Sequence, residues 1–102
     1  MRFALHPEAV EDLDEIQAFI GSVNPDAGDR ILGEIFATFE SLSRLPNQGH
    51  RRPDLTSRPL RFMVVRKHLI AYAPEQHPFW IVAVIDGRRS PRVLAAMLRG
   101  RE

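Results

Sequence analysis

Arginine is the residue type in this sequence whose placement points most directly to chemistry. Residues 51–102 contain eleven Lys and Arg residues, ten of them Arg, against four carboxylates, and their net charge is +7. Residues 1–50 contain three Arg residues against nine carboxylates, and their net charge is −6. Because Arg forms paired hydrogen bonds with carboxylates and phosphates, we expect the second half to meet an acidic partner. The alternative is that codon bias toward Arg and solubility charge explain the excess.

Seven arginines lie in or beside the β-rich part of the chain, where they could form one basic surface. Such a surface can bind phosphates without sequence specificity, because each neutralised phosphate releases counterions. It suits an acidic protein equally well. The predicted partner-binding or target-binding residues are Arg51, Arg52, Arg61, Arg66, Arg88, Arg89 and Arg92.

The sequence lacks the residue patterns that metal binding, serine-nucleophile catalysis and Gly-rich phosphate loops require. The four histidines stand singly, without an i, i+4 pair, and there is no cysteine, so we expect no metal site. No GxSxG nucleophile motif and no Gly-rich phosphate loop is present, and we expect no cofactor. The absence of cysteine fits a reducing, cytoplasmic location. No apolar window is long enough to span a membrane, and the first residues have no signal core.

The length of 102 residues predicts one domain, residues 1–102. A short alternating strand at residues 2–6 leads into a helix from Pro7 to about Gly21. The sequence Asn24-Pro25, a cap followed by proline, starts a second helix that ends near residue 45. With only a few residues between them, these helices should form an antiparallel hairpin. We expect the acidic side chains of the first helix to be solvated.

Three β-rich runs follow a proline-containing loop at residues 46–59. The runs Leu60–Arg66, Leu69–Ala73 and Phe79–Ile85 predict a three-stranded antiparallel meander. The last run is apolar on both faces, which indicates a central strand that is covered on both sides. A short amphipathic helix begins at Pro91. The expected fold is α+β, of order β-α-α-β-β-β-α, with the helical hairpin packed on a small antiparallel sheet.

Four segments, in this order, resemble the RelE/ParE superfamily of bacterial toxins from type II toxin-antitoxin systems. The ParE branch is the closer one. The opening segment contains His6-Pro7-Glu8-Ala9 and Asp12-Leu13-Asp14-Glu15-Ile16; the others are Leu45–Gly49 with Arg52–Leu55, Leu60–Val64 with Leu69–Tyr72, and Val84–Arg89. The chain departs from the family pattern at Asp86, where His is common, and at Ser90, where an acidic residue is common.

The resemblance implies the same fold, with the N-terminal strand joining the sheet, and a toxin that a cognate antitoxin neutralises. It also implies that the complex binds operator DNA through the antitoxin. Members of the ParE branch inhibit DNA gyrase, whereas members of the RelE branch cleave mRNA on the ribosome. We therefore expect a non-catalytic gyrase inhibitor, with two alternatives: an mRNA endoribonuclease, or a degenerate protein-binding module without toxicity.

The nuclease alternative has an incomplete set of residues. Arg61 and Arg88 match basic positions of RelE-like nucleases, but residues 91–102 contain no counterpart of the C-terminal tyrosine. RNA cleavage needs a base for the 2′-hydroxyl, and His68 or His50 could supply it. We expect both histidines to be exposed and non-catalytic, since His68 falls in a predicted hairpin turn. Tyr72 is interpreted as a sheet residue with a bonded hydroxyl.

Overall fold

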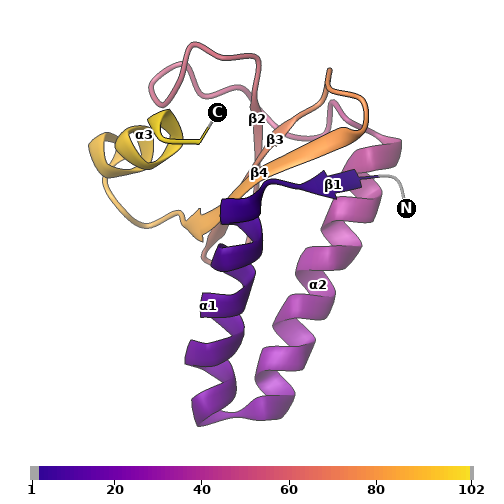
Figure 1. Ribbon diagram of the computed structural model, residues 1–102, viewed down its shortest axis with the longest axis vertical. Helices are drawn as coiled ribbons and strands as arrows, with labels where there is room; N and C mark the ends of the chain where they lie inside the picture. The colour runs from indigo at the N-terminus through magenta and orange to yellow at the C-terminus, as the bar shows by residue number, and fades with distance from the viewer. Residues whose placement is uncertain (1–2, 102) are drawn as a thin grey trace.

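The computed structural model describes residues 3–101 of the chain. Figure 1 shows a pair of long helices beside a twisted sheet, with a third, shorter helix on the other side. This confirms the predicted order β-α-α-β-β-β-α. The elements are β1 (Phe3–Leu5), α1 (Pro7–Val23), α2 (Pro25–Arg44), β2 (Arg61–Val65), β3 (His68–Ala73), β4 (Phe79–Asp86) and α3 (Pro91–Arg99).

The sheet has the strand order β1-β4-β3-β2. The meander of β2, β3 and β4 is antiparallel, as predicted, and β4 lies inside the sheet. However, β1 joins β4 in parallel, with Phe3 opposite Phe79, so the sheet is mixed. A parallel pair needs a long connection, and the helical hairpin and the meander together supply it.

The two long helices are joined by Asn24 alone, because α1 continues to Val23 instead of ending near Gly21. Asn24 ends α1 with its own N–H, which bonds to the carbonyl of Ile20, and starts α2 with its side chain. Its Oδ1 accepts from the N–H of Ala27 at 3.2 Å. One residue therefore serves as the cap of both helices, and this fixes the tight hairpin of Figure 1.

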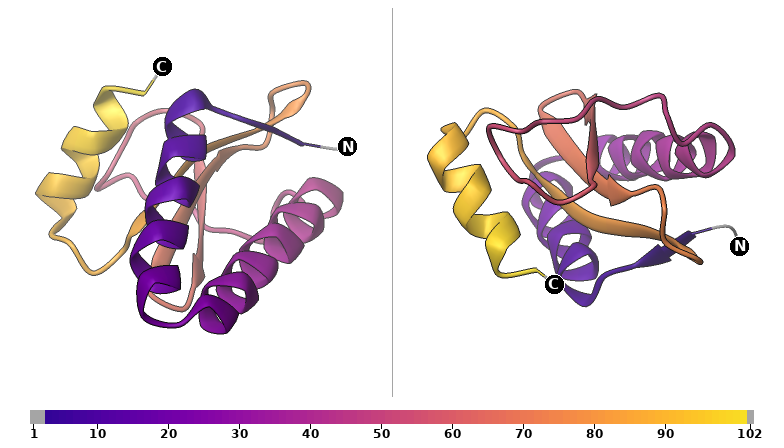
Figure 2. Two further views of the ribbon diagram at one scale, coloured as in Figure 1. Left: turned by 60° about the horizontal axis from the view of Figure 1, so that its bottom comes forward. Right: turned by 90° about the horizontal axis from the view of Figure 1, so that it is seen from above.

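Each face of the sheet has its own apolar core, and Figure 2 shows the helical hairpin and α3 on opposite sides. On the hairpin side, alternate residues of β3 and β4 pack with residues of α1 and α2, among them Leu13, Ile35, Phe39, Ile70 and Ile81. On the other side, α3 and the loop before β2 cover the sheet through Leu55, Leu60, Val82, Leu94 and Leu98. The prediction that β4 is covered on both faces is confirmed.

A β-bulge interrupts the pairing of β3 with β4. Ala71 lies opposite Ala83, but Tyr72 lies opposite Ile81, so Val82 is the extra residue. As a result, both Val82 and Ala83 pack on the α3 side. A bulge leaves backbone groups outside the regular ladder, and these groups need other partners.

The hydroxyl of Tyr72 ties the loop after α2 to the sheet. It donates to the carbonyl of Pro46 at 2.8 Å and accepts from the N–H of Gly49 at 2.9 Å, which confirms the bonded hydroxyl predicted for this residue. Burial raises the pKa of Tyr72. A Cβ atom at position 49 would lie 2.5 Å from that hydroxyl oxygen and 2.6 Å from the carbonyl oxygen of Phe62. Only glycine fits there, because of this close approach.

Candidate functional site

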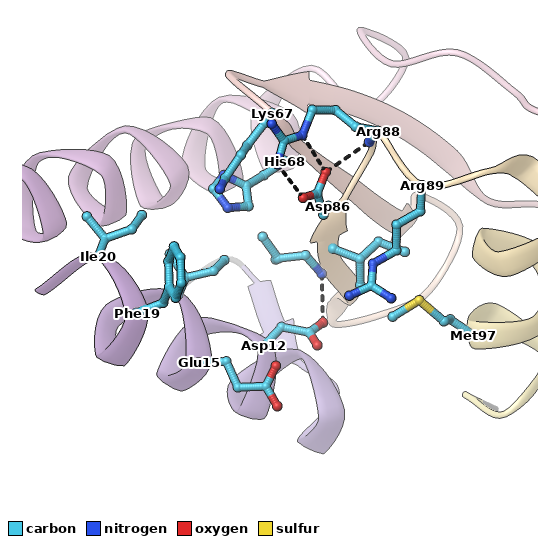
Figure 3. A pocket seen from close by; sticks show the side chains of 13 residues that line it. Asp12, Glu15, Phe19, Ile20, Lys67, His68, Asp86, Arg88, Arg89 and Met97 are labelled. Atoms are coloured by element: carbon cyan, nitrogen blue, oxygen red, sulfur yellow. Dashed lines mark hydrogen bonds and ion pairs between the residues drawn. The ribbon is translucent and has the colours of Figure 1, made fainter. Parts of the chain in front are cut away.

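A groove of about 440 Å³ opens where α1, the turn between β2 and β3, the end of β4 and α3 come together. Figure 3 shows Asp12, Glu15 and Phe19 on the α1 side of this groove, and Asp86, Arg88 and Arg89 at the end of β4. Segments of the acidic first half and of the basic second half of the chain therefore meet in one concave surface. Within residues 3–101, no three His, Asp or Glu side chains are placed to hold a metal ion.

The floor of the groove is apolar. Ile16, Phe19 and Ile20 follow one another at steps of three and one along α1, and Met97 of α3 lies across from them. Phe19 is 71% exposed, which is unusual for a large aromatic side chain. The Nζ of Lys67 lies 5.6 Å from the centroid of the Phe19 ring, a cation–π distance. The groove thus offers an aromatic contact with a cation already beside it.

The end of β4 carries an ion pair at the rim of the groove. Arg88 donates to the carboxylate of Asp86 through Nε at 3.0 Å and Nη2 at 2.8 Å, and its backbone N–H bonds to Oδ1 at 3.0 Å. These bonds hold the pKa of Asp86 well below its usual range and raise the pKa of Arg88. Among residues 3–101, neither Lys67 nor Arg89 takes part in an ion pair. They are the cations of the rim that no ion pair compensates, and the carboxylate of Glu15 on α1 lines the same groove outside any ion pair of the described residues.

His68 is not exposed, contrary to the sequence prediction. The turn consists of Arg66 and Lys67 alone, and Arg66 adopts a positive φ of 55°, so β3 begins at His68. The side chain is 4% exposed and lines the groove. Its Nδ1 is buried and has no hydrogen-bond partner among the described residues. Burial, and then the charge of Lys67, lowers the pKa of His68.

This lowered pKa predicts a loss of stability in acid. Below the ordinary histidine pKa of 6.5, the unfolded chain binds a proton that the folded chain does not bind until its own, lower pKa is reached. The free energy of unfolding should therefore fall as the pH drops through 6.5, by about 1.4 kcal/mol for each pH unit between the two pKa values. Urea denaturation of the wild type and of His68→Leu from about pH 8 to about pH 5 checks this.

The matched control for that titration is His50→Gln, because His50 is exposed, as the sequence predicted. This control should keep the acid-dependent loss, whereas His68→Leu should lack most of it. Equal pH dependence in the wild type and His68→Leu would contradict the assignment to His68.

The predicted arginines divide between the two ends of the sheet. Arg88 and Arg89 lie together in the groove. Arg61 starts β2 at the opposite end, where its Nη1 donates to the carbonyl of Gly49 at 2.8 Å. Arg66, predicted on the strand, lies in the turn and binds Glu34 of α2 through Nε at 3.0 Å and Nη2 at 2.7 Å.

The remaining three predicted arginines also lie outside the groove. Arg52 bonds to Asp54 within the loop before β2, and these hydrogen bonds lower the pKa of that carboxyl. Arg51 in the same loop and Arg92 in the first turn of α3 are exposed. The structure therefore brings Arg88 and Arg89 together with Lys67, a cation that the sequence reasoning had not selected.

Asp12 and Arg101 form a buried ion pair that the sequence reasoning did not predict. Asp12 was assigned to the solvated face of α1, yet it is 8% exposed, and Arg101 beyond α3 is 7% exposed. Arg101 Nη2 donates to Asp12 Oδ1 at 2.9 Å. A signal existed for Asp12: it lies three residues after Ala9 and directly before Leu13, both buried, so it falls on the apolar stripe of the helix. Its partner follows 89 residues later, beyond any local pattern.

Comparison with known protein families matches residues 3–91, most of the chain, to the ParE toxin of type II toxin-antitoxin systems, parDE. The chain belongs to the ParE toxin family. A search of curated proteins finds no match. This ParE family member is thus a toxin of a type II system, and membership implies an antitoxin partner. In the part of the chain that the structure describes, no helix of this toxin is long and apolar enough to cross a membrane.

Proposed function

We propose that this ParE-family toxin inhibits DNA gyrase by binding to it in the cytoplasm, without catalysing a reaction itself. The observation that carries the proposal is the separation of the candidate nuclease cations. Arg61 lies opposite Tyr72, which lies opposite Ile81 of β4, while Arg88 follows the far end of that strand. From Ile81 to Asp86, β4 extends about 17 Å. Stabilising one pentavalent phosphate requires charges that converge on it, and this pair does not converge.

The third nuclease candidate also favours binding over catalysis. His68 lies beside the groove, but it is almost fully buried and burial lowers its pKa. A general base must reach the proton that it removes. An RNA chain cannot bring its 2′-hydroxyl within hydrogen-bond distance of a residue that is only 4% exposed without moving the residues that cover it. A role for His68 in shaping the groove fits these facts better.

The groove is the proposed binding site of the antitoxin. Its apolar floor, formed by Ile16, Phe19 and Met97, suits hydrophobic anchor residues, and Lys67 and Arg89 suit carboxylates. A segment that is disordered alone and folds on binding can supply both kinds of group along an extended surface. In the complex, the antitoxin would also bind operator DNA, so that the toxin reaches DNA only through its partner.

Expression of the chain alone in bacteria tests the proposed target. We expect growth arrest with filamentation and a DNA-damage response, because an inhibited gyrase leaves broken DNA, and we expect co-expression of the antitoxin to restore growth. Purified toxin should inhibit supercoiling by gyrase in vitro. Rapid loss of translation with intact DNA would favour the mRNA endoribonuclease. Normal growth at verified soluble expression would favour a protein-binding module without toxicity.

A further inference from the structure

The outer side of α3 carries positive charge that the rest of the described structure does not neutralise. Residues 87–101 contain five arginines and no carboxylate, and the next carboxylate, Glu102, lies outside the described residues. Two of these arginines are used within the molecule, in ion pairs with Asp86 and Asp12. The other three form no ion pair among residues 3–101. They are Arg89, Arg92 and Arg99.

Helical geometry places Arg92 and Arg99 on the same side of α3, away from the sheet. Leu94 and Leu98 are four residues apart and buried, so they mark the inner face of the helix. Arg92 and Arg99 are two turns apart on the opposite side, and both are exposed. Figure 2 shows α3 at the edge of the molecule, across the sheet from the helical hairpin. Both guanidinium groups are therefore available to one partner.

Hydroxyl groups lie beside Arg99 in a cleft of about 370 Å³ between α3 and the loop before β2. Thr56 and Ser57 line this cleft together with Arg99, and none of the described carboxylates lines it. Arg, Ser and Thr side chains are common donors to the phosphate oxygens of DNA. We call Arg92, Arg99, Thr56 and Ser57 the α3 surface. Its donors and its charge suit phosphate groups.

The α3 surface has no apolar anchor. Between its two arginines lie only the small side chains of Ala95 and Ala96, and the exposed Val93 lies one turn before Met97, on the side of the groove. A protein interface has an apolar or aromatic centre, whereas an interface with DNA is polar and positively charged. Single strands stack their bases on aromatic side chains, and this surface has none. A duplex with its regular array of phosphates fits best.

We propose that the α3 surface binds the phosphate backbone of a DNA duplex without sequence specificity. Two turns of helix span about 10.5 Å, close to three steps of about 3.4 Å along one DNA strand. Arg92 and Arg99 can therefore each contact a phosphate of the same strand. The contact belongs to the toxin without its antitoxin. It places the toxin beside the DNA that gyrase carries, a consequence that rests on the proposed function.

Fluorescence anisotropy tests the proposal, with a labelled DNA duplex of arbitrary sequence and the purified full chain in the absence of gyrase. The logarithm of the association constant should fall against the logarithm of the salt concentration with a slope of about −2 or steeper, because each neutralised phosphate contributes about −0.9. In Arg92→Gln with Arg99→Gln, the slope should become shallower by about 2, and the affinity at about 50 mM salt should drop at least about tenfold. The melting transition should not change, since both side chains are exposed.

The matched control is Arg30→Gln with Arg44→Gln, which removes the same charge from two exposed arginines of α2. Its affinity for the duplex should stay within about twofold of the wild type, because no phosphate contact is lost. Equal weakening in the two double variants would overturn the proposal, since total charge would then explain the binding. So would the absence of binding at about 50 mM salt, or equally tight binding of single-stranded DNA or duplex RNA.

This assay separates the inference from the proposed function, because it contains no gyrase. A toxin that inhibits supercoiling but does not bind the duplex overturns only the DNA contact. A toxin that binds the duplex through the α3 surface but leaves supercoiling unchanged supports the DNA contact and overturns only the proposed target.

Discussion

Replacement of Phe39 by alanine should lower the free energy of unfolding by about 3–5 kcal/mol, the usual cost of removing a large aromatic side chain from a packed core. Phe39 is 0% exposed, and its ring contacts those of Phe3 and Phe36 at centroid distances of 5.3 and 5.2 Å. It therefore joins α2 to the edge strand β1. Urea denaturation followed by circular dichroism measures the loss.

Phe19→Ala is the control for this change, because it removes the same atoms from a side chain that is 71% exposed. Its free energy of unfolding should stay within about 0.5 kcal/mol of the wild type. The antitoxin should nevertheless bind Phe19→Ala more weakly, since the ring lies in the groove. A large loss of stability in this variant would show that Phe19 belongs to the core.

Reversal of both uncompensated charges at the groove, in Lys67→Glu with Arg89→Glu, should weaken antitoxin binding by about 2 kcal/mol or more. Charge pairs that become desolvated in an interface cost about 2–5 kcal/mol when one partner is lost, whereas exposed pairs contribute about 0.2–1 kcal/mol. Calorimetric titration of the purified antitoxin into each variant gives the comparison.

The matched control reverses two charges on α2, in Arg30→Glu with Arg44→Glu. Both residues are exposed and neither lines the groove. The net charge of the chain changes by the same amount in the two double variants, so a long-range effect of total charge would affect both equally. Equal loss of affinity would therefore contradict a local role of Lys67 and Arg89.

Local signals in the sequence were sufficient to predict most of the fold. Proline after a capping residue marks the start of α2 and α3, and apolar runs mark the three strands of the meander. The parallel pairing of β1 with β4 was not predicted, because three residues carry no information about strand direction. The bulge at Val82 was not predicted either. Because β4 is apolar on both faces, an extra residue does not disturb any alternation of polar and apolar side chains.

The candidate site could be predicted only in part, for physical reasons that differ between residues. Arg88 and Arg89 were selected because they follow the central strand directly. Lys67 was passed over as part of a turn, and its position beside Phe19 depends on how α1 packs on the sheet. His68 was predicted to be exposed because it was assigned to the turn before Leu69, whereas in the structure the turn ends at Lys67 and His68 is the first residue of β3.

The pairing of Phe3 with Phe79 has a consequence for how the protein is made. β1 is synthesised first, but it pairs with β4. It therefore has no neighbouring strand until β4 has been synthesised, and this contact between residues distant in sequence forms late. Until then, α1 and α2 can form a hairpin, but their apolar side chains stay exposed because the complete sheet that they pack against is not yet present. Any chain that terminates before β4 keeps that side exposed, which makes it a substrate for chaperones and proteases. We therefore expect that a fragment from interrupted translation that lacks β4 does not gain the toxin fold.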